Sequence, residues 1–330
     1  MKALFLKAAS VVSLFSIAVL AVSCGHSAPE TLTPVKFMLD WVPNTNHTGI
    51  FVAKDKGYFE AAGLDVQIVE PGEVYPEAAV AGGAADFGLS FQENVTLARS
   101  EGAPIVSIAA VLQHNTSGFA SPTSLAVSSP ADFEGLRYGA YGSPSEDPTL
   151  KALMGCVGAD FEKLEVVTTG FSDPLALLAQ GQIDLAWIFY GWQGIQAEQS
   201  GIDLDVVMMA DYFDCVPDYY TPVVIASEET IANDPEAVEA LLVALSRGYT
   251  FAADHPDEAA DILVSAVPEL DGALVRESQN WLSDYYIAEA PRWGEQKDSV
   301  WRDYSGWLVE QHVLSAPIDI EDAFTNRFLP

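Results

Sequence analysis

Residues 39–66, LDWVPNTNHTGIFVAKDKGYFEAAGLDV, decide the fold of this chain. A short apolar run that starts at Val35 ends where this stretch begins, and turn residues at 43–46 then interrupt the pattern. The apolar residues after the turn recur at helical spacing, and Gly63 precedes a second apolar run that is typical of a strand. The stretch therefore predicts a strand, a polar turn, a helix and a second strand.

The turn in this stretch carries side chains that suit a small polar ligand. Asn46 or Thr48 can cap the helix, because either side chain can accept a hydrogen bond from a free backbone N–H. The side chains expected at the mouth of the sheet are Trp41, Asn44, Asn46 and His47. Ligands of α/β proteins lie at the carboxyl ends of strands, so the turn either forms part of a binding site or merely connects two elements.

The size and charge of the chain narrow its class. Its 330 residues are enough for two domains, and a hydrophobic content of 49% allows a large core. The formal charge is −32, from 47 acidic and 15 basic residues. Such an excess leaves no basic patch for nucleic acid or for an anionic membrane surface. We therefore expect no nucleic-acid partner, and a strongly solvated surface accounts for the charge.

The first 23 residues have the pattern of an export signal. A basic start with Lys2 and Lys7 precedes an apolar segment at 8–22, which is short for a membrane span. The segment runs into LAVSCG, which resembles a bacterial lipoprotein signal whose Cys is diacylated and becomes the new N-terminus. The usual Leu stands one position early. We expect residues 1–23 to be removed, Cys24 to carry lipid and residues 24–34 to form a tether on the extracytoplasmic face of the cell membrane; an ordinary secretory signal is the alternative.

Two cysteines remain beyond the lipidation site. An exported protein can join Cys156 to Cys215 in a disulfide, but the spacing alone does not show that they are close. The spacing fits no metal motif. We expect two buried free thiols and no bound metal.

Two segments of the chain resemble each other: GAADF at 83–87 and GQIDL at 181–185. In each, a Gly ends an Ala-rich helix, an Asp caps the turn and a buried strand follows. We therefore expect two similar α/β lobes, although a common helix–strand link would also produce this pattern. The second lobe is an insertion in the first, and the helical tail after residue 229 packs on the first lobe. The expected boundaries are 35–114 plus 224–330 for the first lobe and 115–223 for the second.

Motifs for catalysis are missing from the sequence. It contains no nucleophile elbow, Walker loop or HExxH motif, and its five His are scattered without the spacing of metal ligands. We therefore expect a binding protein without a cofactor rather than an enzyme.

Aromatic residues gather at the ends of the predicted strands. If they face one cleft, they can stack on both faces of a flat ring while polar side chains contact its edge. Each of them can instead belong to the core. Glu93 can neutralise an amidine-like ring nitrogen or be a solvated acid at the start of a helix. Beyond the turn, the candidate ligand contacts are Gln92, Glu93, Trp187, Tyr190, Trp192, Tyr219 and Tyr220.

The turn at 40–49, DWVPNTNHTG, resembles the thiamine-precursor family of ABC-transporter substrate-binding proteins, which also includes riboflavin binders and the fungal pyrimidine synthases. The GYF and GLDV segments in the following helix and strand are shared with sulfonate and nitrate binders and indicate only the superfamily. The resemblance continues in DFG at 86–88, QHNTSG at 113–118, GSP at 142–144, WIFYGW at 187–192 and DYYTP at 218–222.

The resemblance implies a two-lobed type II periplasmic-binding fold that closes on its ligand by hinge motion. Members of this family hold a pyrimidine ring between aromatic residues, which implies Trp41 and Tyr190 as stacking partners. Ser117 and Ser143, in two of the matching segments, complete the candidate ligand contacts. The implied ligand is a thiamine-related aminopyrimidine, with riboflavin, another heteroaromatic compound or a sulfonate as the alternative. The implied partners are an ABC permease and ATPase, and we expect a monomer.

The resemblance also allows the enzyme alternative to be examined by residue. The fungal synthases form a cofactor Schiff base through a Lys and consume a His one turn later. The matching positions here are roughly Ser90 and Asn94. The synthases also carry a Cys-rich run where this chain has PDYY at 217–220. An enzyme that depends on pyridoxal phosphate is therefore the least favoured interpretation.

Overall fold

The computed structural model describes residues 31–72, 74–170 and 172–330, of which Leu32–Pro330 form one compact unit. The expected export signal, the expected lipidation site at Cys24 and most of the tether lie outside the described residues. Within the described part of the chain, no helix is both long and apolar enough to span a membrane.

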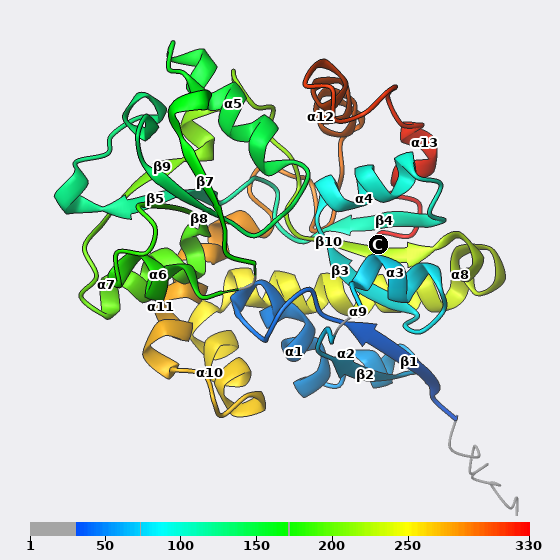
Figure 1. Ribbon diagram of the computed structural model, residues 1–330. Helices are drawn as coiled ribbons and strands as arrows, with labels where there is room; N and C mark the ends of the chain where they lie inside the picture. Colours follow the sequence, from blue (N-terminus) through cyan, green and yellow to red (C-terminus); the bar gives the residue numbers. More distant parts are fainter. Residues whose placement is uncertain (1–30, 73, 171) are drawn as a thin grey trace, which may run out of the picture. The chain divides into compact units, whose positions relative to one another are not determined.

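Sheet A runs in the order β2-β1-β3-β10-β4 (Figure 1). Its strands β1 and β2 pair in parallel, as do β1 and β3, whereas β10 is antiparallel to both β3 and β4. The strand β4 is buried at every position, as its continuous apolar run predicts. The strands are β1 (Thr33–Met38), β2 (Leu64–Val69), β3 (Phe87–Ser90), β4 (Ile105–Ala110) and β10 (Val223–Ser227).

Sheet B runs in the order β7-β6-β8-β5-β9. Here β6 pairs in parallel with β7 and β8, and β5 is antiparallel to β8 and β9. The two sheets share one topology, because in each the fourth strand is antiparallel to its neighbours and enters from the other sheet. The strands are β5 (Ser117–Pro122), β6 (Arg137–Ala140), β7 (Glu165–Thr168), β8 (Leu185–Phe189) and β9 (Leu204–Met208).

The repeated Gly-x-x-Asp motif has the same role in both sheets. Asp86 Oδ2 accepts a hydrogen bond from the backbone N–H of Lys36 in β1 at 2.7 Å. Asp184 Oδ2 accepts one from the backbone N–H of Arg137 in β6 at 3.0 Å. Each Asp thus attaches the start of its own strand to the neighbouring parallel strand. The expected pair of similar α/β lobes is confirmed.

Helices surround both sheets (Figure 1). Those between the strands of sheet A or after β10 are α1 (Thr48–Asp55), α2 (Tyr58–Ala61), α3 (Pro76–Ala81), α4 (Gln92–Ser100), α8 (Glu228–Asn233), α9 (Pro235–Asp254), α10 (Pro256–Ala266), α11 (Gly272–Leu282), α12 (Asp298–Glu310) and α13 (Ile320–Ala323). Those between the strands of sheet B are α5 (Glu146–Cys156), α6 (Pro174–Ala179) and α7 (Ile195–Gln199).

Helices α1 and α9 approach each other closely over sheet A. A Cβ atom on Gly248 would lie 2.0 Å from the backbone oxygen of Gly49, and one on Gly49 would lie 2.3 Å from the ring of Tyr249. Only glycine permits this approach. The hydroxyl of Tyr249 donates to the backbone oxygen of Asn46 at 2.8 Å, so the crossing also supports the turn after β1.

The C-terminal tail packs on both sheets rather than on the first lobe alone. Tyr304 and Trp307 of α12 belong to the apolar cluster that contains Phe119 of sheet B. Trp301 of the same helix belongs to the cluster that contains Val223 of sheet A. This difference from the sequence-based expectation arises because α12 carries apolar side chains on more than one face.

Cys156 and Cys215 form a disulfide, so the expectation of two free thiols was wrong. The bond joins the end of α5 to the segment that follows β9, and the two Cα atoms are 6.0 Å apart. The cysteines are 59 residues apart in the chain. Their proximity depends on how α5 lies relative to sheet B, which the spacing does not contain.

Candidate functional site

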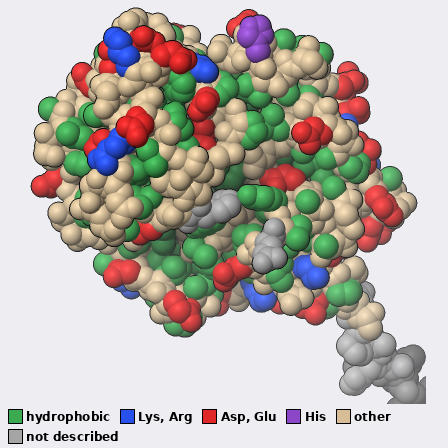
Figure 2. Space-filling model, viewed as in Figure 1, with side chains coloured by type: hydrophobic (Ala, Val, Ile, Leu, Met, Phe, Trp, Pro, Cys, Tyr) green, Lys and Arg blue, Asp and Glu red, His purple; other side chains and the backbone are tan. Residues whose placement is uncertain are grey.

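The chain passes from one sheet to the other at the carboxyl ends of their parallel strands. Residues 111–116 lead from β4 to β5, and residues 209–222 lead from β9 back to β10. Because β1, β3 and β4 run in one direction, and β6, β8 and β9 run in one direction in the other sheet, the residues after these strands lie near the crossovers. The face shown in Figure 2 is hollowed near its centre, and Asp and Glu far outnumber Lys and Arg on it.

Two contacts join the sheets in this region. The ring of Phe91, which follows β3, stacks on the ring of Phe189, which ends β8, with centroids 6.0 Å apart. The hydroxyl of Tyr141, which follows β6, donates to Oε1 of Glu93 at 3.4 Å. Residues that follow strands of the two sheets therefore meet, as ligand-contacting residues of a two-lobed binding protein would.

Glu93 is the buried acid of this region. Its exposed fraction is only 5%, and within the described residues its Oε2 has no hydrogen-bond partner. Burial raises the pKa of Glu93 to about 7, although the hydroxyls of Tyr219, Tyr141 and Ser145 oppose the rise. A buried acceptor without a donor costs about 1–3 kcal/mol or more if charged. Oε2 is therefore a place where a ligand can supply a donor.

Two tyrosines lie beside Glu93. The rings of Tyr219 and Tyr304 stack with centroids 4.4 Å apart, and both side chains are buried. Burial, and then the negative charge of Glu93, raise the pKa of both hydroxyls well above the ordinary value. The Tyr304 hydroxyl is also buried without a partner among the described residues. Sequence reasoning found Tyr219 but missed Tyr304, which is far away in the chain and belongs to no motif.

The N-terminus of α5 holds a second buried acid, Glu146, which is 2% exposed. Its carboxylate accepts hydrogen bonds from the backbone N–H groups of Tyr141 at 3.1 Å, Gly142 at 2.6 Å and Ser143 at 2.7 Å. The Tyr138 hydroxyl donates to it at 2.6 Å. Ser143, an expected ligand contact, thus uses its backbone N–H within the chain. Sequence reasoning missed Glu146, since acidic residues are too common in this chain for one to stand out.

The turn after β1 is held by its own hydrogen bonds. His47 is fully buried; its Nε2 donates to Asp40 Oδ1 at 2.6 Å, and its Nδ1 accepts from the backbone N–H of Asn44 at 3.1 Å. Asn44 Oδ1 accepts from the N–H of Asn46 at 2.9 Å, so Asn44 caps the short helix η1 (Thr45–His47). Helix α1 follows directly, with His47 at its N-cap position and no side-chain cap, so neither Asn46 nor Thr48 caps it as expected. Trp41 lies at the start of this turn and is 44% exposed.

Four other expected site residues form hydrogen bonds inside the protein. Trp187 Nε1 donates to Ser117 Oγ at 2.7 Å, and Ser117 Oγ donates to Asn115 Oδ1 at 2.6 Å. Gln92 Oε1 accepts from the backbone N–H of Tyr220 at 2.8 Å. Ser117, Gln92 and Tyr220 are almost fully buried. These contacts place all four residues in the scaffold beside the crossovers.

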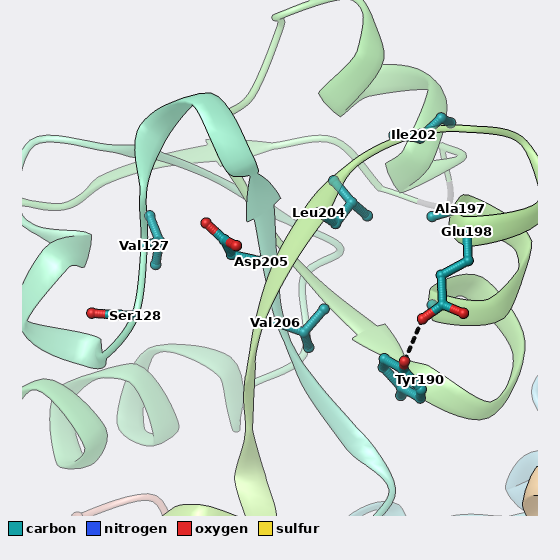
Figure 3. A pocket seen from close by; sticks show the side chains of 10 residues that line it. Val127, Ser128, Tyr190, Ala197, Glu198, Ile202, Leu204, Asp205 and Val206 are labelled. Carbon is teal, nitrogen blue, oxygen red and sulfur yellow. Dashed lines mark hydrogen bonds between the residues drawn. The ribbon is translucent and has the colours of Figure 1, made fainter.

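Tyr190 and Trp192 lie in a π-helical turn, η5 (Tyr190–Gly194), that follows β8. The hydroxyl of Tyr190 donates to Glu198 at 2.5 Å, and its ring lies 5.3 Å from the ring of Trp281. Trp192 packs against an apolar cluster that contains Phe51 of α1. Tyr190 also lines a pocket of about 420 Å³ (Figure 3). That pocket lies among β9, α7 and η5, on the side of sheet B alone.

Comparison with known proteins identifies the family. The model of the NMT1/THI5-like family matches residues 44–259. The chain belongs to this family. Within the described residues of this NMT1/THI5-like protein, no cluster of His, Cys, Asp and Glu is arranged to hold a metal ion.

Relatives of this NMT1/THI5-like chain have different names. It is 30% identical to a formylaminopyrimidine-binding protein of Halalkalibacterium halodurans, over 97% of this chain and 99% of the relative. It is 26% identical to the riboflavin-binding protein RibY of Chloroflexus aurantiacus, over 92% of this chain and 88% of the relative. It is 24% identical to a 4-amino-5-hydroxymethyl-2-methylpyrimidine phosphate synthase of Legionella pneumophila, over 90% of this chain and 92% of the relative.

Solved structures show the same fold. The alkanesulfonate-binding protein SsuA of Xanthomonas axonopodis pv. citri, bound to MOPS, superposes with a TM-score of 0.68 at 15% identity, over 89% of this chain and 98% of that one. The periplasmic aliphatic sulphonate-binding protein SsuA of Escherichia coli gives a TM-score of 0.67 at 14% identity, over 89% and 92%. The expected two-lobed type II periplasmic-binding fold is confirmed.

Proposed function

We propose that this protein is an extracytoplasmic solute-binding lipoprotein of an ABC importer and that its ligand is a thiamine-related aminopyrimidine. Family membership, the fold and the relative named for formylaminopyrimidine support the importer role. The observation that carries the ligand class is Glu93, a buried acid between the sheets whose Oε2 has no partner among the described residues.

The chemistry of an aminopyrimidine suits Glu93. A ring nitrogen beside an exocyclic amine forms an amidine-like edge, and protonation of that nitrogen gives two parallel N–H donors. A carboxylate accepts such a pair through both oxygens, in short charge-assisted hydrogen bonds. Because burial raises the pKa of Glu93 to about 7, the site without ligand holds both the acid and the carboxylate form near neutral pH, and the carboxylate form can accept both donors.

Trp41 is the stacking residue in this proposal. It is 44% exposed, and the hydrogen bonds of the turn hold its backbone at the carboxyl end of β1. Aromatic stacking of this kind contributes about 0.5–1.5 kcal/mol beyond the area that it buries. Tyr190 remains the proposed second stacking residue, because the family resemblance implies it.

The proposed lobes consist of residues 35–114 plus 224–330 and of residues 115–223, with the crossovers as the hinge. We propose a monomer that delivers its ligand to a permease and ATPase, with lipid on Cys24 as the membrane anchor. Replacing Cys24 with Ala should move the protein from the membrane fraction to the soluble fraction. Retention of the variant in the membrane fraction would contradict the lipid anchor but not the ligand class.

Isothermal calorimetry with the chain without its export signal tests the ligand. We expect formylaminopyrimidine or the related hydroxymethyl aminopyrimidine to bind more tightly than thiamine, riboflavin or MOPS. If riboflavin or MOPS binds and no pyrimidine does, the aminopyrimidine assignment is wrong. Riboflavin is the second candidate, since a relative with 92% coverage of this chain is named as a riboflavin binder.

Absorbance after incubation with pyridoxal phosphate tests the enzyme alternative. A synthase of the fungal kind needs an internal aldimine with a Lys, which gives a characteristic absorption band. This chain has Ser90 at the position matched to that Lys, and the Ser90 hydroxyl donates to Glu77. We expect no aldimine band, and a band that sodium borohydride removes would contradict the proposal.

A further inference from the structure

The loop between β6 and α5 has the geometry of an anion site that is already filled. The backbone N–H groups of three successive residues, Tyr141, Gly142 and Ser143, lie in the loop just before this helix of 11 residues and converge on one carboxylate. Such a nest of successive backbone N–H groups binds anionic groups in other proteins. Here the carboxylate of Glu146, from the first turn of the same helix, occupies it.

The filled nest adjoins the proposed ligand site. Tyr141 connects the two, because its N–H donates to Glu146 Oε1 at 3.1 Å and its hydroxyl donates to Glu93 Oε1 at 3.4 Å. The second observation that points to a ligand here is independent of the helix: Glu93 Oε2 is buried without a partner among the described residues. None of the ion pairs among those residues includes Glu93 or Glu146.

We infer that Glu146 is a specificity residue: it fills the nest with a carboxylate of the chain itself, so that the site accepts a neutral or cationic ring and rejects a ligand with a phosphate or sulfonate group. This inference rests on the proposed function of the same site. An incoming anion would have to displace the carboxylate of Glu146, which accepts four hydrogen bonds. It would then lie near two buried acids, Glu93 and Glu146, and among the described residues no Lys or Arg forms an ion pair with either acid. Because Glu93 and Glu146 are both buried, their charges are less screened than those of exposed acids and repel an incoming anion.

The filled nest would distinguish this chain from a protein that binds phosphorylated pyrimidines. Aminopyrimidines related to thiamine occur both as the free alcohol and as its phosphate ester, and a ring-binding site alone does not distinguish them. An open nest would bind the ester more tightly, whereas a filled nest excludes it. The inferred ligand class is therefore the unphosphorylated aminopyrimidine.

A double variant opens the nest. Glu146→Ala removes the carboxylate, but it also deprives the buried Tyr138 hydroxyl of its acceptor, which would destabilise the protein for an unrelated reason. Tyr138→Phe removes that hydroxyl and leaves the ring. The test protein is therefore Tyr138→Phe with Glu146→Ala, and Tyr138→Phe alone is the matched control, since its nest stays filled.

Calorimetry with the hydroxymethyl aminopyrimidine and its phosphate ester measures the effect. We expect the wild type and the control to bind the alcohol and to reject the ester. The double variant should gain about tenfold or more in affinity for the ester, because one charge-assisted hydrogen bond corresponds to at least that factor. Equal binding of the ester and the alcohol by the wild type would overturn the inference, as would a double variant that binds the alcohol but gains nothing for the ester.

The melting temperature in added inorganic phosphate tests this inference independently of the proposed function. If the wild type binds no pyrimidine, the proposed function fails, but the nest can still be examined by the melting temperature in added phosphate. Phosphate should stabilise the double variant and not the control, and the absence of that difference in a folded double variant would contradict the filled-nest interpretation.

If circular dichroism shows that the double variant does not fold, Glu146→Gln replaces it. This variant keeps one acceptor oxygen and loses the charge, so its preference for the alcohol over the phosphate ester should be weaker than that of the wild type. An unchanged preference would refute the inference.

Discussion

His114 and Asp218 join the two crossovers between the sheets: Nδ1 of His114, in the first crossover, donates to Oδ2 of Asp218, in the second, at 2.6 Å. The other oxygen of Asp218 accepts from the backbone N–H of Asn115 at 3.0 Å. Nε2 of His114 donates to Glu289 at 2.9 Å. The hydrogen bond to Asp218 is the main cause that raises the pKa of His114 to about 9, and the carboxylate of Glu289 adds to the rise.

The raised pKa of His114 predicts a loss of stability at alkaline pH. A folded-state pKa of about 9 lies above the ordinary value of 6.5, so the folded protein binds this proton more tightly. The stabilisation is fully present below pH 6.5 and is lost as the pH rises through about 9. Urea unfolding of the wild type and of His114→Gln across this window measures it. The difference in the free energy of unfolding between the wild type and the variant should shrink as the pH rises. A constant difference would contradict a charged hydrogen bond between His114 and Asp218.

Glu93→Gln should stabilise the empty protein above neutral pH. The folded-state pKa of about 7 lies above the ordinary value of 4.5, so the wild type loses stability as the pH rises from 4.5 to about 7. The variant has no charge to bury, and its advantage should approach roughly 3 kcal/mol at pH 8 and vanish below pH 4.5. Urea unfolding at both ends of this range checks the difference.

The same substitution should weaken ligand binding. An amide cannot accept two parallel N–H donors, and one hydrogen bond to a charged group contributes about 1.5–3 kcal/mol, or tenfold or more in affinity. Calorimetry with the hydroxymethyl aminopyrimidine at pH 7 measures the loss. Undiminished affinity in Glu93→Gln would show that the ligand donates its hydrogen bonds elsewhere.

Trp41→Ala should reduce binding without unfolding the protein. The side chain is 44% exposed, so its removal should cost clearly less stability than the removal of a fully buried Trp. Trp293→Ala is the contrasting control, because Trp293 is 1% exposed and stacks on Tyr249 at 4.6 Å. That variant should lose about 3–5 kcal/mol. Urea unfolding and calorimetry on both variants separate a ligand contact from a core residue, and a collapse of stability in Trp41→Ala would place Trp41 in the core.

Removing the disulfide should destabilise the protein. Cys156 and Cys215 close a loop across 59 residues, and the chain-entropy model assigns about 4 kcal/mol to a loop of this length. Unfolding of the Cys156→Ser, Cys215→Ser double variant, compared with the wild type, measures the cost. A reductant should lower the stability of the wild type and leave the variant unchanged.

Much of the scaffold could be predicted from the sequence because its signals are local. The strand, turn and helix at 39–66 follow from apolar spacing and turn residues within one segment. The Gly-x-x-Asp motif predicted two similar lobes, and Asp86 and Asp184 make the same hydrogen bond to a neighbouring strand in the two sheets. Local periodicity and turn chemistry act over a few residues, so they can be read without knowing the fold.

The candidate site could be predicted only in part. Glu93 was found because it lies in the first turn of a helix that follows a strand, but nothing in the sequence indicated that Tyr304 lies beside it. The expected cap of α1 by Asn46 or Thr48 was wrong, because Asn44 caps the short helix η1 before it and α1 itself has no side-chain cap. His47 matched the pattern of a ligand contact, whereas in the structure its two ring nitrogens hold the turn.

By itself, the sequence determined the two-lobed α/β architecture, the family resemblance and the polar, aromatic character of the strand ends. Tertiary structure alone decided that Cys156 reaches Cys215, that α12 packs on both sheets and that Glu146 fills the nest beside Glu93. The physical reason is the range of the interactions. Propensity and periodicity are properties of neighbouring residues, whereas a disulfide, a buried acid and a shared core depend on which distant segments pack together.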